Sequence, residues 1–250
     1  SNLPFGFERN ARLITDADFS QATLSWSPDG RNILAEKPKA TYMLGVGEFK
    51  PQGQLVSLPA TRVAQLKASW QKEIDKETQS KLGKLPDEVR DVIERKTSGF
   101  LFSEDQTKVL YTSTASASFK NKLIEPLPGS STQKQERDIK SGFTYLYDIK
   151  EDRNFLILEN SQDLTINHRS SIVGASKRKL IWFPTSRHLI LAEPDKIELM
   201  EYDGTNRTIL WTASYESPFA FISPDGDQLI ILTSLGTQSG ETNLYTINLR

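Results

Sequence analysis

The sequence of 250 residues contains no cysteine, and this absence excludes three kinds of site. Without a thiol the chain cannot form a disulfide bond, a thiolate metal site or a cysteine nucleophile. Histidine is almost as scarce: only His168 and His188 occur, without the spacing of a metal-binding or metalloprotease motif. The Gly-x-Ser-x-Gly elbow of serine hydrolases and the glycine-rich phosphate loop are also missing. We therefore predict that the chain is not an enzyme, and we assign it no catalytic residue, no cofactor and no metal ion.

An excess of charge of one sign is missing as well. The 31 basic and 32 acidic residues give a net charge of -1, so no overall field attracts nucleic acid or an anionic membrane. The short basic run from Lys177 to Lys179 is interpreted as a solvated edge of the fold rather than as a polyanion site. We expect no nucleic-acid partner.

Long apolar runs are absent too. None approaches the roughly 18 residues that a membrane-spanning helix requires, so we do not expect this segment to insert into a membrane. The sequence begins with Ser1 and Asn2 and no methionine, so a signal or an anchor can precede it. Its length suits one sizeable core, and we expect a monomer.

Four stretches of the sequence repeat one pattern, and this repetition is its most informative feature. Each is a short apolar strand with an aromatic residue that enters a tight turn and is followed at once by a second strand. The four copies are Leu24 to Gly30, Phe100 to Asp105, Leu180 to Ser186 and Phe219 to Gly226. A unit that cannot bury its own apolar face must stack on copies of itself, so the repeat predicts stacked hairpins.

The spacing of the copies predicts the kind of stack. Pro28 and the matching Glu104 are 76 residues apart, Glu104 and Pro184 are 80 apart, and Pro184 and Pro224 are 40 apart. The first interval contains a helical segment of 36 residues and the second a loop of 28 residues. Without these segments the three intervals are 40, 52 and 40 residues long. A unit of about 40 to 45 residues is typical of a four-stranded propeller blade.

We therefore predict an all-β fold, a four-bladed β-propeller that forms a single domain over residues 1–250. The blades cover about 22–60, 97–160, 178–214 and 217–250, with a helical insertion at 61–96 and a loop insertion at 114–141. The last blade lacks a fourth strand, whereas residues 10–17 have a strand-like pattern and no partner. Because unpaired sheet edges favour aggregation, we predict that this N-terminal strand closes the ring.

The helical insertion is predicted to be a hairpin of two helices. In the first, from about Arg62 to Leu82, an apolar stripe contains Trp70. The second starts near Pro86 and places Val89, Val92 and Ile93 on one face. These faces either pack on the propeller and on each other or grip a partner, and the sequence leaves both readings open.

Propeller topology places both insertions on one face of the ring, together with the long connection at 160–179. Function usually resides in such loops on a rigid scaffold. The candidate binding residues on this face are Trp70, Glu136, Arg137, His168 and Arg169. A flexible loop tip is the plainer alternative for Glu136 and Arg137, and an ordinary surface histidine is the plainer alternative for His168.

Two copies of the repeat carry a family resemblance. Trp26 to Arg31 and Phe221 to Gly226, each followed by a second strand, resemble the repeats of TolB-like and WD-like bacterial propellers. The stretches Lys108 to Ser113 and Leu127 to Tyr147 further resemble uncharacterised bacterial surface proteins that join a PEGA domain to a propeller. The resemblance implies an extracytoplasmic module at the bacterial cell surface, anchored by a region outside this sequence.

The resulting expectation is a non-catalytic binding scaffold that recognises a protein or an envelope glycan through the insertion-bearing face. The alternative is an enzyme, either a propeller hydrolase or the accessory propeller domain of a protein similar to prolyl oligopeptidase. That alternative requires an acid and a base clustered in the central channel, or a catalytic domain beyond the two ends of this sequence.

Overall fold

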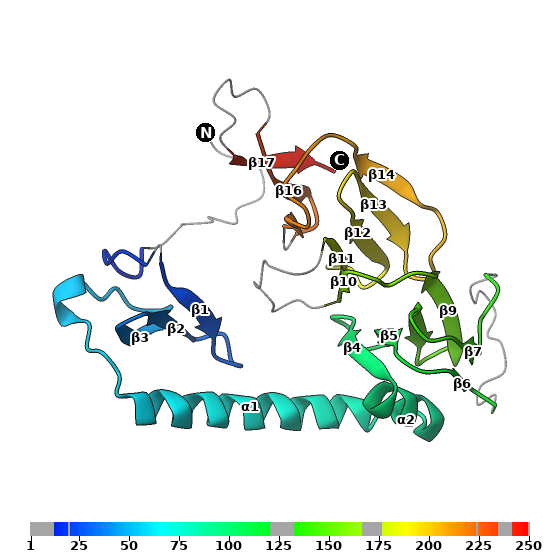
Figure 1. Cartoon of the computed structure of the whole chain (residues 1–250), viewed down its shortest axis with the longest axis horizontal. Coiled ribbons are helices and arrows are strands. Elements are labelled where there is room, and N and C mark those ends of the chain that lie inside the picture. Colours follow the sequence, from blue (N-terminus) through cyan, green and yellow to red (C-terminus); the bar gives the residue numbers. More distant parts are fainter. Residues whose placement is uncertain are drawn as a thin grey trace. The chain divides into compact units, whose positions relative to one another are not determined.

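The computed structural model describes residues 13–19, 21–120, 133–166, 177–223, 225–234 and 242–249. Within them the chain is mostly β, with 17 strands in several sheets and two α-helices (Figure 1). Contacts divide the chain into two compact units, Ser1–Leu82 and Gly83–Arg250. Each unit is described by itself below.

The first unit contains one antiparallel sheet and one long helix. The sheet has the order β1-β2-β3, from strands Thr23–Trp26, Asn32–Lys37 and Ala40–Gly45. One face of it forms a small core in which Ile33, Ala35 and Leu44 are buried. A short 3-10 helix at Gln52–Gln54 then leads to α1 at Ala60–Leu82.

This sheet has no fourth strand from Gln54 to Pro59, where the four-stranded blade expected over residues 22–60 would need one. The segment follows the 3-10 helix as an irregular chain, and the N–H of Leu58 donates to the carbonyl oxygen of Thr41 at 2.7 Å. Pro59 has no N–H to extend a ladder, and α1 begins directly after it.

The second unit contains three larger sheets and the helix α2 at Asp87–Arg95. Sheet two has the order β4-β5-β8-β9, from strands Thr97–Phe102, Lys108–Ser113, Thr144–Asp148 and Arg153–Leu158. Sheet three has the order β10-β11-β12-β13-β14, from strands Leu164–Thr165, Arg178–Trp182, His188–Ala192, Ile197–Glu201 and Thr208–Trp211. Sheet four has the order β15-β16-β17, from strands Ala220–Ile222, Gln228–Thr233 and Asn243–Asn248.

Hydrogen bonds confirm the fourfold repeat of the hairpin. Two backbone hydrogen bonds recur in each copy. The N–H of the residue that enters the turn donates to the carbonyl oxygen of the fifth residue after it, and the carbonyl oxygen of the entering residue accepts from the N–H of the third residue after it. The entering residues are Ser27, Ser103, Phe183 and Ser223, and the eight N–H···O distances are between 2.8 and 3.0 Å. The third residue after each has a positive φ, at Gly30, Gln106, Ser186 and Gly226. The four turns therefore share one backbone conformation although only two of them keep the Asp-Gly sequence.

Sheet three is covered on both faces. Leu180, Trp182 and Leu189 share a core with sheet two, whereas Ile181 and Ile190 share a core with sheet four. Successive side chains of a strand point to opposite faces, so a sheet that is buried on both sides needs apolar residues at nearly every position. The run Leu180 to Trp182 meets this requirement.

The two helices have the predicted positions, and of the two readings left open for their apolar faces the structure shows packing on the sheet for α2. Val89, Val92 and Ile93 are 1 to 4% exposed, and the contacts of α2 are with β4 and β5. The first residues after Pro86 are Asp87 and Glu88, which suit the N-terminal end of a helix. The stripe of α1 that contains Trp70 is half-buried, and within α1 only Leu82 is buried.

Closure of a ring is not confirmed. Residues 13–17 belong to no strand, and the carbonyl oxygen of Ile14 accepts a hydrogen bond from the N–H of Lys50 at 2.9 Å. Within the described part of the chain, β17 pairs with β16 and its other edge has no strand beside it. Four blades and a closing strand remain a prediction, as does a single domain over residues 1–250.

Candidate functional site

The second helix of the helical insertion and the loop insertion meet on sheet two. The helix α2 precedes β4, and the loop insertion joins β5 to β8, where it forms the short strands β6 (Ala117–Ser118) and β7 (Asp138–Ile139). The backbone N–H of Lys120, in the loop insertion, donates to Glu88 Oε2 of α2 at 2.9 Å. We call α2 together with residues 114–120 and 133–141 the insertion surface.

Arg137 fastens the returning segment of the loop insertion to sheet two. Its Nε donates to the carbonyl oxygen of Phe119 at 3.1 Å, and its Nη1 donates to the carbonyl oxygen of Asp152 at 3.0 Å. The guanidinium also pairs with the Asp152 carboxylate, which is 2% exposed, at 3.5 Å. The hydroxyl of Tyr147 donates to the same carboxylate at 2.7 Å. Arg137 therefore joins three segments that are distant in sequence.

Glu136 is held by its backbone. Its N–H donates to the carbonyl oxygen of Asn154 at 2.7 Å, and its own carbonyl oxygen accepts from Asn154 Nδ2 at 2.7 Å. The amide oxygen of Asn154 is hydrogen-bonded as well, because the hydroxyl of Tyr111 donates to Oδ1 at 2.9 Å. Because Tyr111 and Asn154 are fully buried, this segment is tied to the interior of the sheet.

The buried phenols of this network stay protonated at physiological pH. Burial raises the pKa of Tyr111 well above 10, and burial together with the hydrogen bond to Asp152 raises the pKa of Tyr147. Both hydroxyls are thus permanent donors that hold Asn154 and Asp152 in place. Their chemistry suits a structural support for the loop rather than proton transfer at neutral pH.

A cavity of about 410 Å³ lies within the insertion surface. It is lined by Gly83, Leu85, Pro86, Asp87, Glu88, Val89, Arg90, Arg137 and Asp152. Arg90 forms an ion pair with Asp87, and its side chain is 37% exposed. The lining carries charges of both signs beside apolar groups, so it can accept a ligand with polar groups of both kinds.

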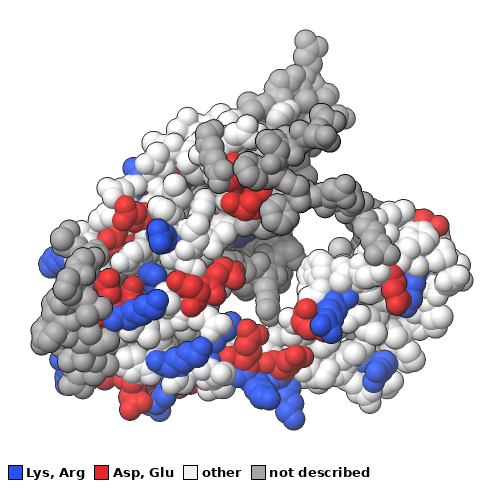
Figure 2. Space-filling model, turned by 180° about the vertical axis from the view of Figure 1, so that it is seen from behind, with Lys and Arg blue, Asp and Glu red and all other residues white. Residues whose placement is uncertain are grey.

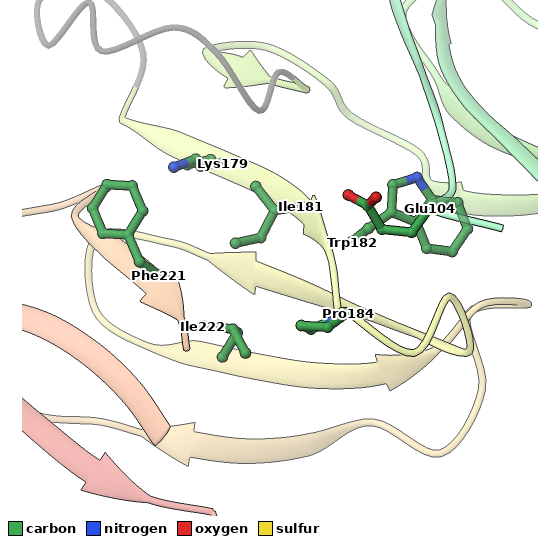
Figure 3. Close-up of a pocket in the computed structure, with 7 residues that line it drawn as sticks. All are labelled: Glu104, Lys179, Ile181, Trp182, Pro184, Phe221 and Ile222. Carbon is green, nitrogen blue, oxygen red and sulfur yellow. The ribbon is translucent and has the colours of Figure 1, made fainter. Parts of the chain in front are cut away.

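A second cavity, of about 500 Å³, lies where sheets two, three and four approach one another (Figure 3). It is lined by Glu104, Lys179, Ile181, Trp182, Pro184, Phe221 and Ile222. These residues come from the β4–β5 turn, from β11 with the turn after it, and from β15. We call it the inner cavity.

The structure corrects the interpretation of Lys179. The residue is only 9% exposed, although the basic run at 177–179 suggested a solvated edge. Its partners across the sheet are Thr165 and Ala192, so it lies on the same face of β11 as Ile181. That face packs against sheet four, which accounts for the burial.

Of the five candidate binding residues, the structure brings two together. Glu136 and Arg137 lie on the insertion surface, where both hold the loop in place and Arg137 also lines the cavity. Trp70 lies on α1 of the first unit and is half-buried. His168 and Arg169 lie outside the described residues.

Neither metal ligation nor membrane insertion has a visible site in the described ranges. Among those residues, no group of three His, Asp or Glu side chains lies close enough to hold a metal ion. Neither described helix combines the length and the apolar character that a membrane-spanning helix needs. Figure 2 shows Lys and Arg side chains interspersed with Asp and Glu on the face that it presents, as a near-neutral composition predicts.

Comparisons with known proteins find similarity only among solved structures; no protein-family model and no curated protein matches the chain. The chain is similar to TolB from Acinetobacter baumannii (11% identity, TM-score 0.34) and to a putative TolB from Agrobacterium tumefaciens (10%, 0.34). It is also similar to the acylaminoacyl peptidase of Pyrococcus horikoshii (12%, 0.33).

These alignments cover 91, 91 and 92% of this chain and 40, 76 and 31% of the other three. The chain therefore spans less than half the length of the A. baumannii TolB and of the peptidase. TM-scores of 0.33 to 0.34 do not establish a shared fold, so the architecture rests on the strand pairings and the repeated hydrogen bonds.

Proposed function

We propose that the chain is a four-bladed β-propeller whose last blade is completed by the N-terminal segment at 10–17. The fourfold hairpin and the face-to-face packing of sheets two, three and four support the ring. Among the described strands none lies beside the outer edge of β17, and this supports a closing strand, because an unpaired edge invites pairing with other chains.

We further propose that the protein is a binding scaffold that recognises a protein or an envelope glycan through the insertion surface. The observation that carries the proposal is the network of Tyr111, Tyr147, Asp152 and Asn154 beneath Glu136 and Arg137. Holding a surface loop in one conformation costs entropy, and buried polar groups are costly unless all are paired. The segment at 133–141, held in this way, is suited to recognition because it does not have to be ordered when a partner arrives.

The protein acts, in this proposal, as a monomer outside the cytoplasmic membrane at the bacterial cell surface. A region outside this sequence, of the kind that the PEGA resemblance implies, holds it there. Its partner is not nucleic acid, since the charges of the chain are balanced.

The test uses a substitution in the cavity of the insertion surface rather than a deletion. Removal of residues 61–96 would take away Val92 and Ile93, which are buried on the face of α2 that packs against β4 and β5, so that loss of binding could reflect unfolding. Arg90→Glu reverses a charge in the cavity, and Arg95→Glu is its matched control, because Arg95 is 76% exposed on the last turn of the same helix.

Cell-envelope extracts and purified envelope glycan fragments are applied to the immobilised protein, and retained molecules are identified by mass spectrometry. We expect one partner to be retained equally by the wild type and by Arg95→Glu, and at least tenfold less by Arg90→Glu. Equal retention by Arg90→Glu, or no retained molecule at all, would contradict the proposal.

A further inference from the structure

The cationic side chains near Lys179 in sheet three form ion pairs with glutamate residues. Arg178 Nη2 lies 2.7 Å from Glu193 Oε1, and Lys196 Nζ lies 2.8 Å from Glu198 Oε1. Lys179 differs from these neighbours, because its ammonium group has no hydrogen bond or ion pair with any residue that the structure describes. The carboxylates of Glu193 and Glu198 in this region therefore form ion pairs with other cations and not with Lys179.

An aromatic ring takes the place of a counter-ion. Lys179 Nζ lies 4.0 Å from the centroid of the Phe221 ring, and both residues line the inner cavity. Figure 3 shows Lys179 beside Phe221 at one end of the labelled set, with Glu104 and Trp182 at the other. Phe221 is 44% exposed, whereas Trp182 is 3% exposed and donates its indole N–H to the carbonyl oxygen of Leu101 at 3.2 Å. The cavity thus has a cationic end and apolar walls.

An ammonium group in this position is destabilised by the loss of water. Burial lowers the pKa of Lys179 below 10.5, and no neighbouring charge offsets that effect. A ring face recovers part of the lost solvation, but much less than an anion in contact with the ammonium group. An anion that enters the cavity therefore gains a strong, partly desolvated contact.

Glu104 limits which anion fits. Its exposed carboxylate lines the same cavity, so a ligand with two or more negative charges is repelled there, whereas a singly charged one can keep its charge near Lys179. The side chains of Ile181, Ile222 and Phe221 provide contact for an apolar body. A volume of about 500 Å³ is within the range of small-molecule sites.

We propose that the inner cavity binds a small organic carboxylate with an apolar body, and that Lys179 holds the carboxylate beside the Phe221 ring. The site is separate from the insertion surface, so this proposal stands or falls independently of the proposed partner.

Phenylacetate is the probe, and 2-phenylethanol, its neutral counterpart, and inorganic phosphate are the comparisons. Binding to the full chain is measured by titration with heteronuclear NMR. We expect phenylacetate to bind at least tenfold more tightly than either comparison. Absence of phenylacetate binding at millimolar concentration, or tighter binding of phosphate, would overturn the proposal.

Two substitutions assign the binding to the inner cavity. Lys179→Met removes the charge and keeps the length of the side chain, and it should weaken phenylacetate binding at least tenfold. Lys177→Met is the matched control on the exposed start of the same run, and it should leave binding unchanged. Glu104→Gln, in an exposed turn that tolerates the change, should strengthen binding two- to fivefold. Unchanged affinity in both Lys179→Met and Glu104→Gln would place the ligand elsewhere and refute the site.

Discussion

Tyr111 and Tyr147 are buried phenols that donate hydrogen bonds to Asn154 and Asp152. Their free hydroxyls ionise near pH 10 in the unfolded chain, whereas burial keeps both protonated in the folded chain. Burial likewise raises the pKa of Tyr202 to about 12. Above pH 10 the folded state therefore holds more protons than the unfolded state, and stability must fall as the pH rises.

We predict that the free energy of unfolding, measured with urea between pH 8 and 11, declines above about pH 10. A fully buried tyrosine contributes a slope of up to about 1.4 kcal/mol per pH unit. Lys179 acts in the opposite direction below 10.5, since its lowered pKa leaves the folded state with fewer protons. Tyr111→Phe should make the decline shallower, whatever its effect on stability at pH 8. An equal or steeper decline in this variant would show that Tyr111 is not the source.

At the residue scale, the sequence pattern predicted some conformations and burial states and missed others, and the misses have a physical reason. The Asp-Gly turns were visible in two copies, but Gln106 and Ser186 adopt the same positive φ without a glycine, so that the shared turn conformation is seen only in the backbone angles and hydrogen bonds. Lys179 appeared solvated because a run of charges does not say which face each side chain takes. Alternation along β11 was the available signal, because Lys179 shares the face of Ile181.

At the scale of elements, the strength of a periodic pattern decided what could be predicted. The face of α2 with Val89, Val92 and Ile93 was legible because helical spacing repeats within nine residues. The two-residue strands β6, β7 and β10 were missed, since so short a segment has no period. The polar network under the loop insertion was missed as well, because Arg137 and Asp152 are brought together by the return of the chain rather than by a motif.

The loop insertion provides a prediction at this scale. Asp152→Asn keeps the shape of the side chain and suits the positive φ of 48° at this position, but it removes the charge that Arg137 and Tyr147 contact. We expect residues 133–141 to lose about 2 kcal/mol of amide-exchange protection while β8 and β9 keep theirs, because a hydrogen bond to a charged group is worth about 1.5 to 3 kcal/mol.

Asp163→Asn serves as the control, since Asp163 also has a positive φ, of 55°, and is exposed. If protection at 133–141 is unchanged in Asp152→Asn, the ion pair does not order the loop. The support for the insertion surface as a recognition site would then be removed.

At the scale of the whole molecule, the proposed ring explains several features together. Sheet three is apolar on both faces because it has a sheet on each side. In sheet four, Leu244 on β17 is 72% exposed, and among the described residues no strand lies beside the outer edge of β17, as expected of a blade that awaits its closing strand. The repeated turns predicted four like units, but ring closure depends on contacts between distant segments, which no local pattern encodes.

The absence of cysteine permits a direct measurement of that closure. Leu13→Cys is combined with Leu244→Cys, and the pair is treated with a short bis-maleimide at low protein concentration. The control pair combines Leu13→Cys with Lys150→Cys, on the turn between β8 and β9 in sheet two. The proposed ring predicts fast intramolecular cross-linking of the first pair and little of the second. Equal or slower cross-linking of residues 13 and 244 would contradict a ring closed by the N-terminal segment.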